Sequence, residues 1–192
     1  MESGRIEVIC GSMFSGKSEE LLRRLRRAEI AGLKYILCKP VQDTRTNGGI
    51  ATHAGGEKDA YSVSSAFQIL SLLATNDVDI IAVDEAQFLD DVAVGVFQDL
   101  ANKGKTILIA GLDLDYRAQP FGPMPQLMAI AETVTKLHAV CVVCGKDACR
   151  TQRISSSREL IDIGASDRYE ARCRTHFEPP TFQKEDEEWV GI

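Results

Sequence analysis

The fold is dictated by RIEVICGSMFSGKS, residues 5–18. Its first part, Arg5 to Cys10, is rich in β-branched residues, which predicts a strand. The second part matches G-x-x-x-x-G-K-[ST] from Gly11 to Ser18 and lies where that pattern belongs, after a strand and at the start of a helix. Glycines let successive backbone N–H groups face phosphate oxygens, and the helix start adds partial positive charge. The sequence therefore predicts a phosphate-binding loop.

The two polar residues that end the predicted loop, Lys17 and Ser18, have expected roles in binding ATP. Lys17 is expected to reach the β- and γ-phosphates of ATP, and Ser18 is expected to ligate Mg²⁺. The alternative, a glycine turn that binds nothing, would leave Lys17 at the helix start unexplained. The residues expected to contact phosphate are Gly11, Ser12, Met13, Phe14, Ser15, Gly16, Lys17 and Ser18.

A second motif is the apolar stretch from Asp79 to Val83, which ends in Asp84 and Glu85. Asp84 is expected to hold the magnesium, directly or through water. Glu85 is then free to take a proton from an attacking hydroxyl or water, so we predict that it is the general base. An acidic pair often only begins a surface turn, but the phosphate loop argues against that interpretation here. The two motifs predict nucleoside triphosphate binding without identifying the acceptor.

Short β-branched runs alternate with amphipathic segments over the first 140 residues, which predicts a parallel α/β sheet flanked by helices. Residues 40–60 contain four glycines and little periodicity, so we expect a mobile loop there. The expected strands are Arg5–Cys10, Tyr35–Cys38, Ile80–Val83 and Thr106–Ala110, and the expected helices are Gly16–Ala31, Ser65–Ala74 and Val92–Asn102.

Composition narrows the class of protein. The 192 residues are 44% hydrophobic and 26% charged, as in globular proteins. A net charge of −6 argues against holding nucleic acid mainly by phosphate neutralisation. No signal peptide and no apolar run long enough to span a bilayer are visible, so we expect a cytoplasmic protein without a membrane partner. In that reducing compartment the six cysteines favour packing, metal binding or catalysis over disulfides.

Four residues have the spacing of a metal site. Cys141-x-x-Cys144 is followed by Cys173-x-x-His176, and two such pairs can surround a tetrahedral Zn²⁺ with no open position. This predicts a structural zinc that anchors the residues between the pairs. The alternative is two buried thiols beside an unrelated Cys173 and His176. We expect domain boundaries that give a nucleotide-binding domain at 1–140, a zinc-binding subdomain at 141–180 and an acidic, flexible tail at 181–192.

The ordered motifs resemble those of type 1 (class II) thymidine kinases over about residues 5–176. They are Met13–Ser18, Asp84–Phe88, Gly111–Asp113, Pro120–Gly122, Thr151–Arg153 and Gly164–Tyr169, together with the zinc-binding quartet. The resemblance implies a P-loop NTPase (RecA-like) fold with a small zinc-containing C-terminal subdomain. That subdomain would carry a lasso loop, residues 154–173, that covers a pyrimidine nucleoside.

The resemblance also implies a nucleoside site. Its residues would be Met13, Phe88, Leu112, Tyr116, Phe121, Thr151, Ile163, Gly164 and Tyr169. Arg45 and Arg153 match recurrent arginines that could stabilise phosphoryl charge, although Arg45 fits an exposed arginine equally well. A homotetramer and feedback inhibition by thymidine triphosphate are further implications.

The leading hypothesis is an ATP-dependent kinase that phosphorylates the 5′-hydroxyl of thymidine, and of deoxyuridine, for nucleotide salvage. One alternative is a nucleic-acid-stimulated P-loop ATPase with a zinc ribbon, in which Glu85 activates water. Another is a zinc-stabilised regulatory module without catalysis, which would give Glu85 no task.

Overall fold

A six-stranded parallel sheet forms the centre of the computed structural model, which describes residues 4–42, 49–51, 57–157, 159–160, 162 and 166–180. The strands are β1 (Arg5–Gly11), β2 (Tyr35–Pro40), β5 (Tyr61–Val63), β6 (Ile80–Val83), β7 (Thr106–Gly111) and β8 (Thr133–Leu137). They lie in the order β5-β2-β6-β7-β1-β8, and each neighbouring pair is parallel. The predicted α/β architecture is confirmed.

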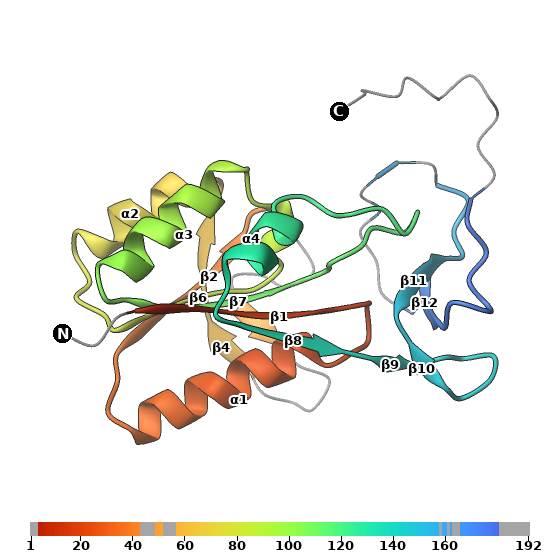
Figure 1. Cartoon of the computed structure of the whole chain (residues 1–192), viewed down its shortest axis with the longest axis horizontal. Coiled ribbons are helices and arrows are strands. Elements are labelled where there is room, and N and C mark those ends of the chain that lie inside the picture. The colour runs from red at the N-terminus through yellow and green to blue at the C-terminus, as the bar shows by residue number, and fades with distance from the viewer. Residues whose placement is uncertain are drawn as a thin grey trace.

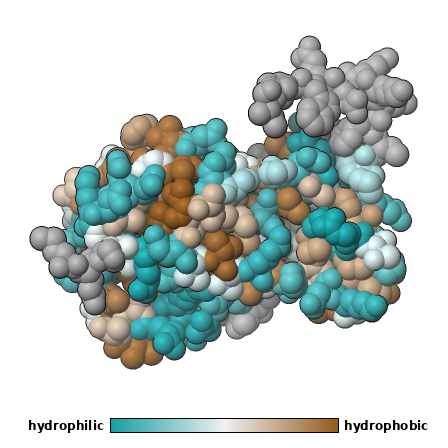
Figure 2. All heavy atoms as spheres, in the orientation of Figure 1, coloured by the Kyte–Doolittle hydropathy of each residue, from teal (hydrophilic) through white to brown (hydrophobic). Residues whose placement is uncertain are grey.

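Helices cover both faces of this sheet (Figure 1). α1 (Lys17–Ile30) lies on one face, and α2 (Ala66–Leu73), α3 (Val92–Asn102) and α4 (Met124–Ile130) lie on the other. Alternate residues of β1 serve the two cores: Ile6 and Val8 pack with the α2–α4 side, and Ile9 packs with α1. Burial on both faces explains the nearly continuous apolar sequence of the central strands. On the face in Figure 2, hydrophilic residues are widespread and apolar ones gather near α3 and α4.

The seven elements expected from the sequence are all present, with ends that differ by up to two residues. Within the stretch 40–60, for which a mobile loop was expected, β3 (Gly49–Ala51) pairs with β4 (Glu57–Asp59) in antiparallel fashion, outside the central sheet, and the mobility of the stretch stays a prediction. Strands of three residues are too short to show a hydrophobic period. β5 and β8 were not anticipated either. Within the described residues, no helix has the length and apolar character needed to cross a membrane.

A smaller body follows β8 at the end of the sheet where β1 leads into α1 (Figure 1). It contains two antiparallel pairs, β9 (Ala139–Val140) with β10 (Asp147–Ala148) and β11 (Arg150–Arg153) with β12 (Tyr169–Arg172). Among the residues of this body that the structure describes, the buried apolar cluster consists of Ala139, Cys141, Ala148 and Ala171, with Cys173 packed against them. So few small side chains give little hydrophobic stabilisation, so a bound metal that cross-links this body would supply stability that its core does not. The domain boundary at residue 140 stays a prediction.

Candidate functional site

The predicted site residues follow three adjacent strands. The phosphate loop comes after β1, Asp84 comes after β6, and Leu112 comes after β7, which lies between them in the sheet. Parallel strands end at one edge, and ligands of open α/β sheets bind beyond those carboxyl ends. The topology therefore gathers these residues as the sequence suggested.

The phosphate loop is tightly wound. Gly11, Phe14 and Gly16 have positive φ angles of 143°, 65° and 83°. A Cβ atom on Gly11 would lie 2.3 Å from the Leu137 carbonyl oxygen, so no other residue fits there. Ser15 Oγ is buried and has no hydrogen-bond partner among the described residues. A buried hydroxyl without a partner is costly, and a phosphate oxygen would satisfy it. The loop therefore fits a phosphate.

Two polar residues at the start of α1 are held in place. The side chain of Lys17 is buried, and its Nζ donates a hydrogen bond to the Ser12 carbonyl oxygen at 2.8 Å. Ser18 Oγ donates to Asp84 Oδ2 at 2.7 Å, which joins the phosphate loop to the end of β6. A hydroxyl and a carboxylate are oxygen ligands of the kind that Mg²⁺ binds beside substrate phosphates. The pair therefore fits the predicted magnesium site.

Asp84 lies in an unusual electrostatic environment, with only 3% of its surface exposed. Burial, and then the negative charge of Glu85, raise the pKa of Asp84 to about 6. The hydrogen bond from Ser18 and the charge of Lys17 act in the opposite direction. A divalent cation bound to the Asp84 carboxylate would offset both effects that raise its pKa. A carboxylate that favours a bound cation in this way is suited to be a metal ligand.

Glu85 is fixed by its backbone and by one amide side chain. Its φ of 53° lies in the left-handed region, and its N–H donates to Asp84 Oδ1 at 2.9 Å. Gln87 Nε2 donates to Glu85 Oε2 at 2.5 Å, and Gln87 Oε1 accepts from the Leu112 N–H at 2.9 Å. Gln87 is only 2% exposed. Gln87 lies within the Asp84–Phe88 motif, where the sequence indicates no role for it, and the structure shows that it holds Glu85.

The aromatic residues predicted to surround a nucleoside fall into two groups. The rings of Phe88 and Phe121 meet edge to face with centroids 5.6 Å apart. Tyr116 and Tyr169 both lie close to Arg153, whose guanidinium carbon is 3.6 Å from the Tyr116 ring centroid and 5.3 Å from that of Tyr169. Apolar ring faces suit a flat base. The structure thus groups four predicted pocket residues into two aromatic clusters.

Of the other predicted pocket residues, three have one hydrogen bond each that bears on the site, and the rest lie outside the described part of the chain. Thr151 Oγ1 accepts a hydrogen bond from the Met13 N–H at 3.0 Å, so these two residues touch. Leu112 contacts Gln87 through its backbone. Ile163, Gly164 and the predicted phosphate-stabilising Arg45 lie outside the described residues.

Arg153 is buried inside the lasso loop, with 8% of its surface exposed. Its Nη1 donates to the carbonyl oxygens of Ser157 and Glu159, and its Nη2 donates to Leu160 O at 3.1 Å and to Tyr169 Oη at 2.8 Å. These contacts bind the guanidinium within the loop, and a role in stabilising phosphoryl charge stays a prediction.

Asp162 fixes the same loop. It accepts hydrogen bonds from Ser155 Oγ at 2.6 Å and from Arg168 Nη1. The bond from Ser155 and the charge of Arg168 keep the pKa of Asp162 below its usual value. An ionised Asp162 therefore ties the two ends of the loop together.

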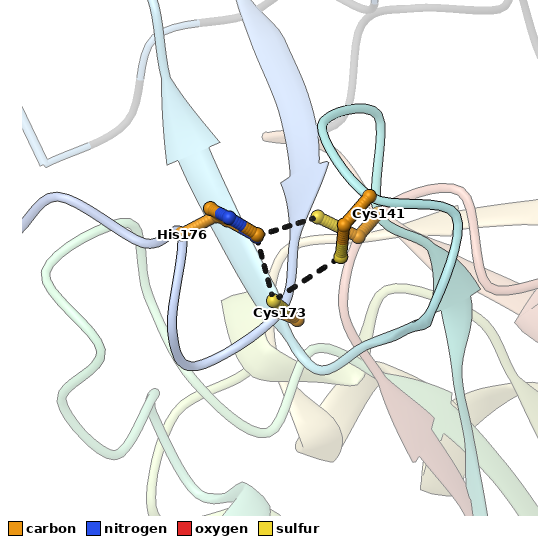
Figure 3. A group of neighbouring side chains, drawn as sticks. Cys141, Cys173 and His176 are labelled. Carbon is orange, nitrogen blue, oxygen red and sulfur yellow. Dashed lines mark hydrogen bonds between the residues drawn. The ribbon is translucent and has the colours of Figure 1, made fainter.

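The predicted zinc ligands converge. The Sγ atoms of Cys141, Cys144 and Cys173 and a ring nitrogen of His176 all lie within 4.8 Å of one another. Figure 3 shows Cys141, Cys173 and His176 pointing toward a common centre. The Cys144–Cys173 sulfur distance is 3.8 Å, which is the separation of about 3.8 Å expected for two sulfurs that are each bound to a tetrahedral zinc.

The chemistry of the donor set also fits a metal. Burial acts to raise the pKa of Cys141, but the backbone N–H groups of Cys173, Val143 and Cys144 outweigh it and lower that pKa to about 6. A thiolate is the form that binds metal, and this turn stabilises it at neutral pH. Three thiols and one imidazole within this space are a typical structural zinc set.

Comparison with known proteins identifies the family to which this chain is similar. A family model described as thymidine kinase matches residues 4–177. The thymidine kinase of Rhodothermus sp. (strain ITI 518) is 51% identical over 178 residues, which cover 92% of this chain and 83% of the relative. The thymidine kinase of Bdellovibrio bacteriovorus is 49% identical over 177 residues, which cover 92% and 86%.

Among solved structures, AMPPCP-bound DnaA from Aquifex aeolicus aligns with a TM-score of 0.42 and 16% identity. The alignment covers 71% of this chain and 41% of that one, so the chain spans less than half of its length.

Proposed function

The chain belongs to the thymidine kinase family, and on that premise we propose that it transfers the γ-phosphoryl group of ATP to the 5′-hydroxyl of thymidine. The observation that carries the proposal is the meeting of two motifs, in which Ser18 of the phosphate loop bonds Asp84 at 2.7 Å and Glu85 follows directly. Deoxyuridine, which lacks only the base methyl group, is proposed as a second acceptor. Nothing in the comparisons favours the alternative of a nucleic-acid-stimulated ATPase.

The phosphate loop holds and orients ATP in this proposal. Its backbone N–H groups, other than that of Met13, and Ser15 Oγ face the phosphates, and Lys17 leaves the Ser12 carbonyl to contact the transferring group. Ser18 and Asp84 would hold Mg²⁺, which supplies positive charge to the β- and γ-phosphate oxygens when bound. The protein thus stabilises charge that develops on the phosphoryl group.

Glu85 accepts the proton of the 5′-hydroxyl as the hydroxyl attacks the γ-phosphorus. A general base must be held within hydrogen-bond reach of that proton. The hydrogen bond from Gln87 and the left-handed backbone at Glu85 hold it so. The same amide contacts the backbone of Leu112, so the base is fixed relative to the nucleoside pocket.

The lasso loop covers the nucleoside in this proposal. The ring pairs around Phe121 and Tyr116 supply apolar faces for the base, and backbone groups at 160–164 hydrogen-bond its polar edge. A covered site excludes water, which favours transfer to the nucleoside over hydrolysis of ATP. The four metal ligands would hold a structural zinc, which when bound stabilises the fold of this subdomain.

A homotetramer and feedback inhibition by thymidine triphosphate are proposed on the resemblance alone. A domain boundary at residue 140, and neither nucleic acid nor a membrane as partner, are proposed on the sequence pattern, the charge and the hydropathy. We place the protein in the cytoplasm, because the metal cluster needs three reduced thiols.

The test is incubation with ATP, Mg²⁺ and a panel of ribo- and deoxynucleosides, with and without single-stranded DNA. Thymidine and deoxyuridine are expected to give 5′-monophosphates, in equal amounts with and without DNA. ATP hydrolysis that depends on DNA, without any nucleoside monophosphate, would contradict the proposal and support the ATPase alternative.

A further inference from the structure

Two hydrogen bonds join the phosphate loop to the small body, and we call this pair the clasp. Ser12 Oγ donates to the Ala148 carbonyl oxygen at 3.3 Å, and the Met13 N–H donates to Thr151 Oγ1 at 3.0 Å. The partners are 136 and 138 residues apart in the chain. Ser12 is 3% exposed and Thr151 is 4% exposed, so the Ser12 bond is buried and the Met13 bond is partly shielded from water. Shielding makes a hydrogen bond stronger and its loss more costly.

The clasp acts on the part of the loop that sets its shape. The peptide between Ser12 and Met13 carries the carbonyl that accepts from Lys17 Nζ and the N–H that donates to Thr151. Thr151 therefore fixes the plane of this peptide from outside the loop. The next residue, Phe14, has a φ of 65°, a conformation that a non-glycine residue keeps only where its surroundings hold it.

The other side of the clasp is attached to the metal ligands. Ala148 lies on β10, which pairs with β9, and Cys141 directly follows β9. Thr151 lies on β11, which pairs with β12, and Cys173 directly follows β12. Each acceptor of the clasp, Ala148 and Thr151, therefore lies on a strand whose partner strand leads directly to a predicted metal ligand.

We propose that Thr151 is a positioning residue of the nucleotide site, whose hydroxyl holds the phosphate loop in its binding shape through the Met13 N–H. The hydroxyl then serves ATP, while the methyl group remains for the nucleoside contact proposed above. The metal-anchored segment supports both substrate sites at once. This inference rests on the proposed function in so far as ATP is taken as the nucleotide.

The test measures binding of the non-hydrolysable analogue AMPPNP with Mg²⁺, by calorimetry and without nucleoside. Thr151→Val keeps the shape of the side chain and removes the acceptor, so the Kd is expected to rise about fivefold, the equivalent of one net hydrogen bond. Thr151→Ser keeps the hydroxyl and is expected to bind as tightly as the parent protein. Thr133→Val, an exposed threonine of β8, is the matched control and should change nothing.

Steady-state kinetics separate the two uses of Thr151. Thr151→Val is expected to raise the KM for ATP while Thr151→Ser restores it. An unchanged AMPPNP Kd in Thr151→Val, with only the KM for thymidine altered, would overturn the inference and leave the proposed function intact. A parent protein that phosphorylates no nucleoside would instead defeat the proposed function, and the AMPPNP comparison would still decide the inference. If Thr151→Val does not fold, Thr151→Ala decides, because it also removes the acceptor of the Met13 N–H and is expected to weaken AMPPNP binding, whereas unchanged binding would overturn the inference.

Discussion

Replacing Gln87 by methionine is expected to slow turnover by about 10- to 150-fold and to leave ATP affinity unchanged. Methionine matches the length of glutamine and suits a site that is 2% exposed, but it can neither donate to Glu85 nor accept from Leu112. Glu85 would then keep its charge and its backbone position while its carboxylate lost the partner that orients it. The substitution therefore tests whether the orientation of the Glu85 carboxylate matters for turnover, because the carboxylate itself remains.

The magnitude follows from the contacts. A hydrogen bond to a charged group contributes about 1.5–3 kcal/mol, which is about 10- to 150-fold in rate if the bond acts only when Glu85 is correctly placed. Misplacing a reacting group by about 1 Å costs about 100-fold, which agrees with that range. The unpaired Leu112 N–H should also lower the free energy of unfolding by about 1–3 kcal/mol.

The assay is kcat and KM for thymidine and for ATP, with urea unfolding measured in parallel. Gln98→Met is the control, since Gln98 is an exposed glutamine of α3 and should affect neither quantity. A parental kcat in a folded Gln87→Met protein would refute the idea that this amide orients Glu85. A raised ATP KM with unchanged kcat would refute it too, because Gln87 would then belong to nucleotide binding.

Three further outcomes are expected. Glu85→Gln should bind AMPPNP and thymidine like the parent but lose about 100- to 10,000-fold in kcat, the usual contribution of a general base, and a kcat within threefold would remove Glu85 from that role. The purified protein should hold one zinc per chain by elemental analysis, whereas Cys173→Ser should hold much less and expose residues 141–176 to faster hydrogen exchange; unchanged exchange would show that the metal does not support the subdomain. Gly122→Ala should destabilise the protein by more than about 1 kcal/mol in urea, because its φ is 50° and a Cβ would meet Gln87 O at 2.2 Å, whereas Gly95→Ala on α3, with nothing within 4 Å, should stabilise it by about 0.5–1 kcal/mol.

Local patterns explain what could be predicted from the sequence. The phosphate loop, the Asp84–Glu85 pair and the zinc ligands are each encoded within a few residues, and the strands before the first two motifs are largely buried on both faces. β8 gave no such signal because it is an edge strand, and its sequence TVTKL has no fully buried side chain. β5 has only three residues, and only Val63 among them is buried. Strands at the edge of a sheet need fewer apolar residues, so hydrophobic patterns do not reveal them.

Contacts between distant residues explain what could not be predicted. The role of Gln87 becomes apparent only in the folded protein, where the backbone N–H of Leu112, 25 residues further along the chain, donates to its side chain. The clasp likewise depends on β11 lying against the phosphate loop. Spacing along the chain carries no information about either, because each hydrogen bond is created by the packing of the two segments.

Arg153 shows how the same residue type can fit two chemistries. A motif near a phosphate site suggests an arginine that stabilises phosphate charge, yet a guanidinium also has five donors in one plane and stacks on aromatic faces. A loop with little regular structure leaves carbonyl oxygens that need donors, and Arg153 supplies them to Ser157, Glu159 and Leu160 while it stacks on Tyr116. The described part of the lasso loop is therefore organised around a buried cation. Because Arg153 is only 8% exposed, each of these hydrogen bonds is costly to lose, so the guanidinium is expected to hold this part of the loop in one conformation.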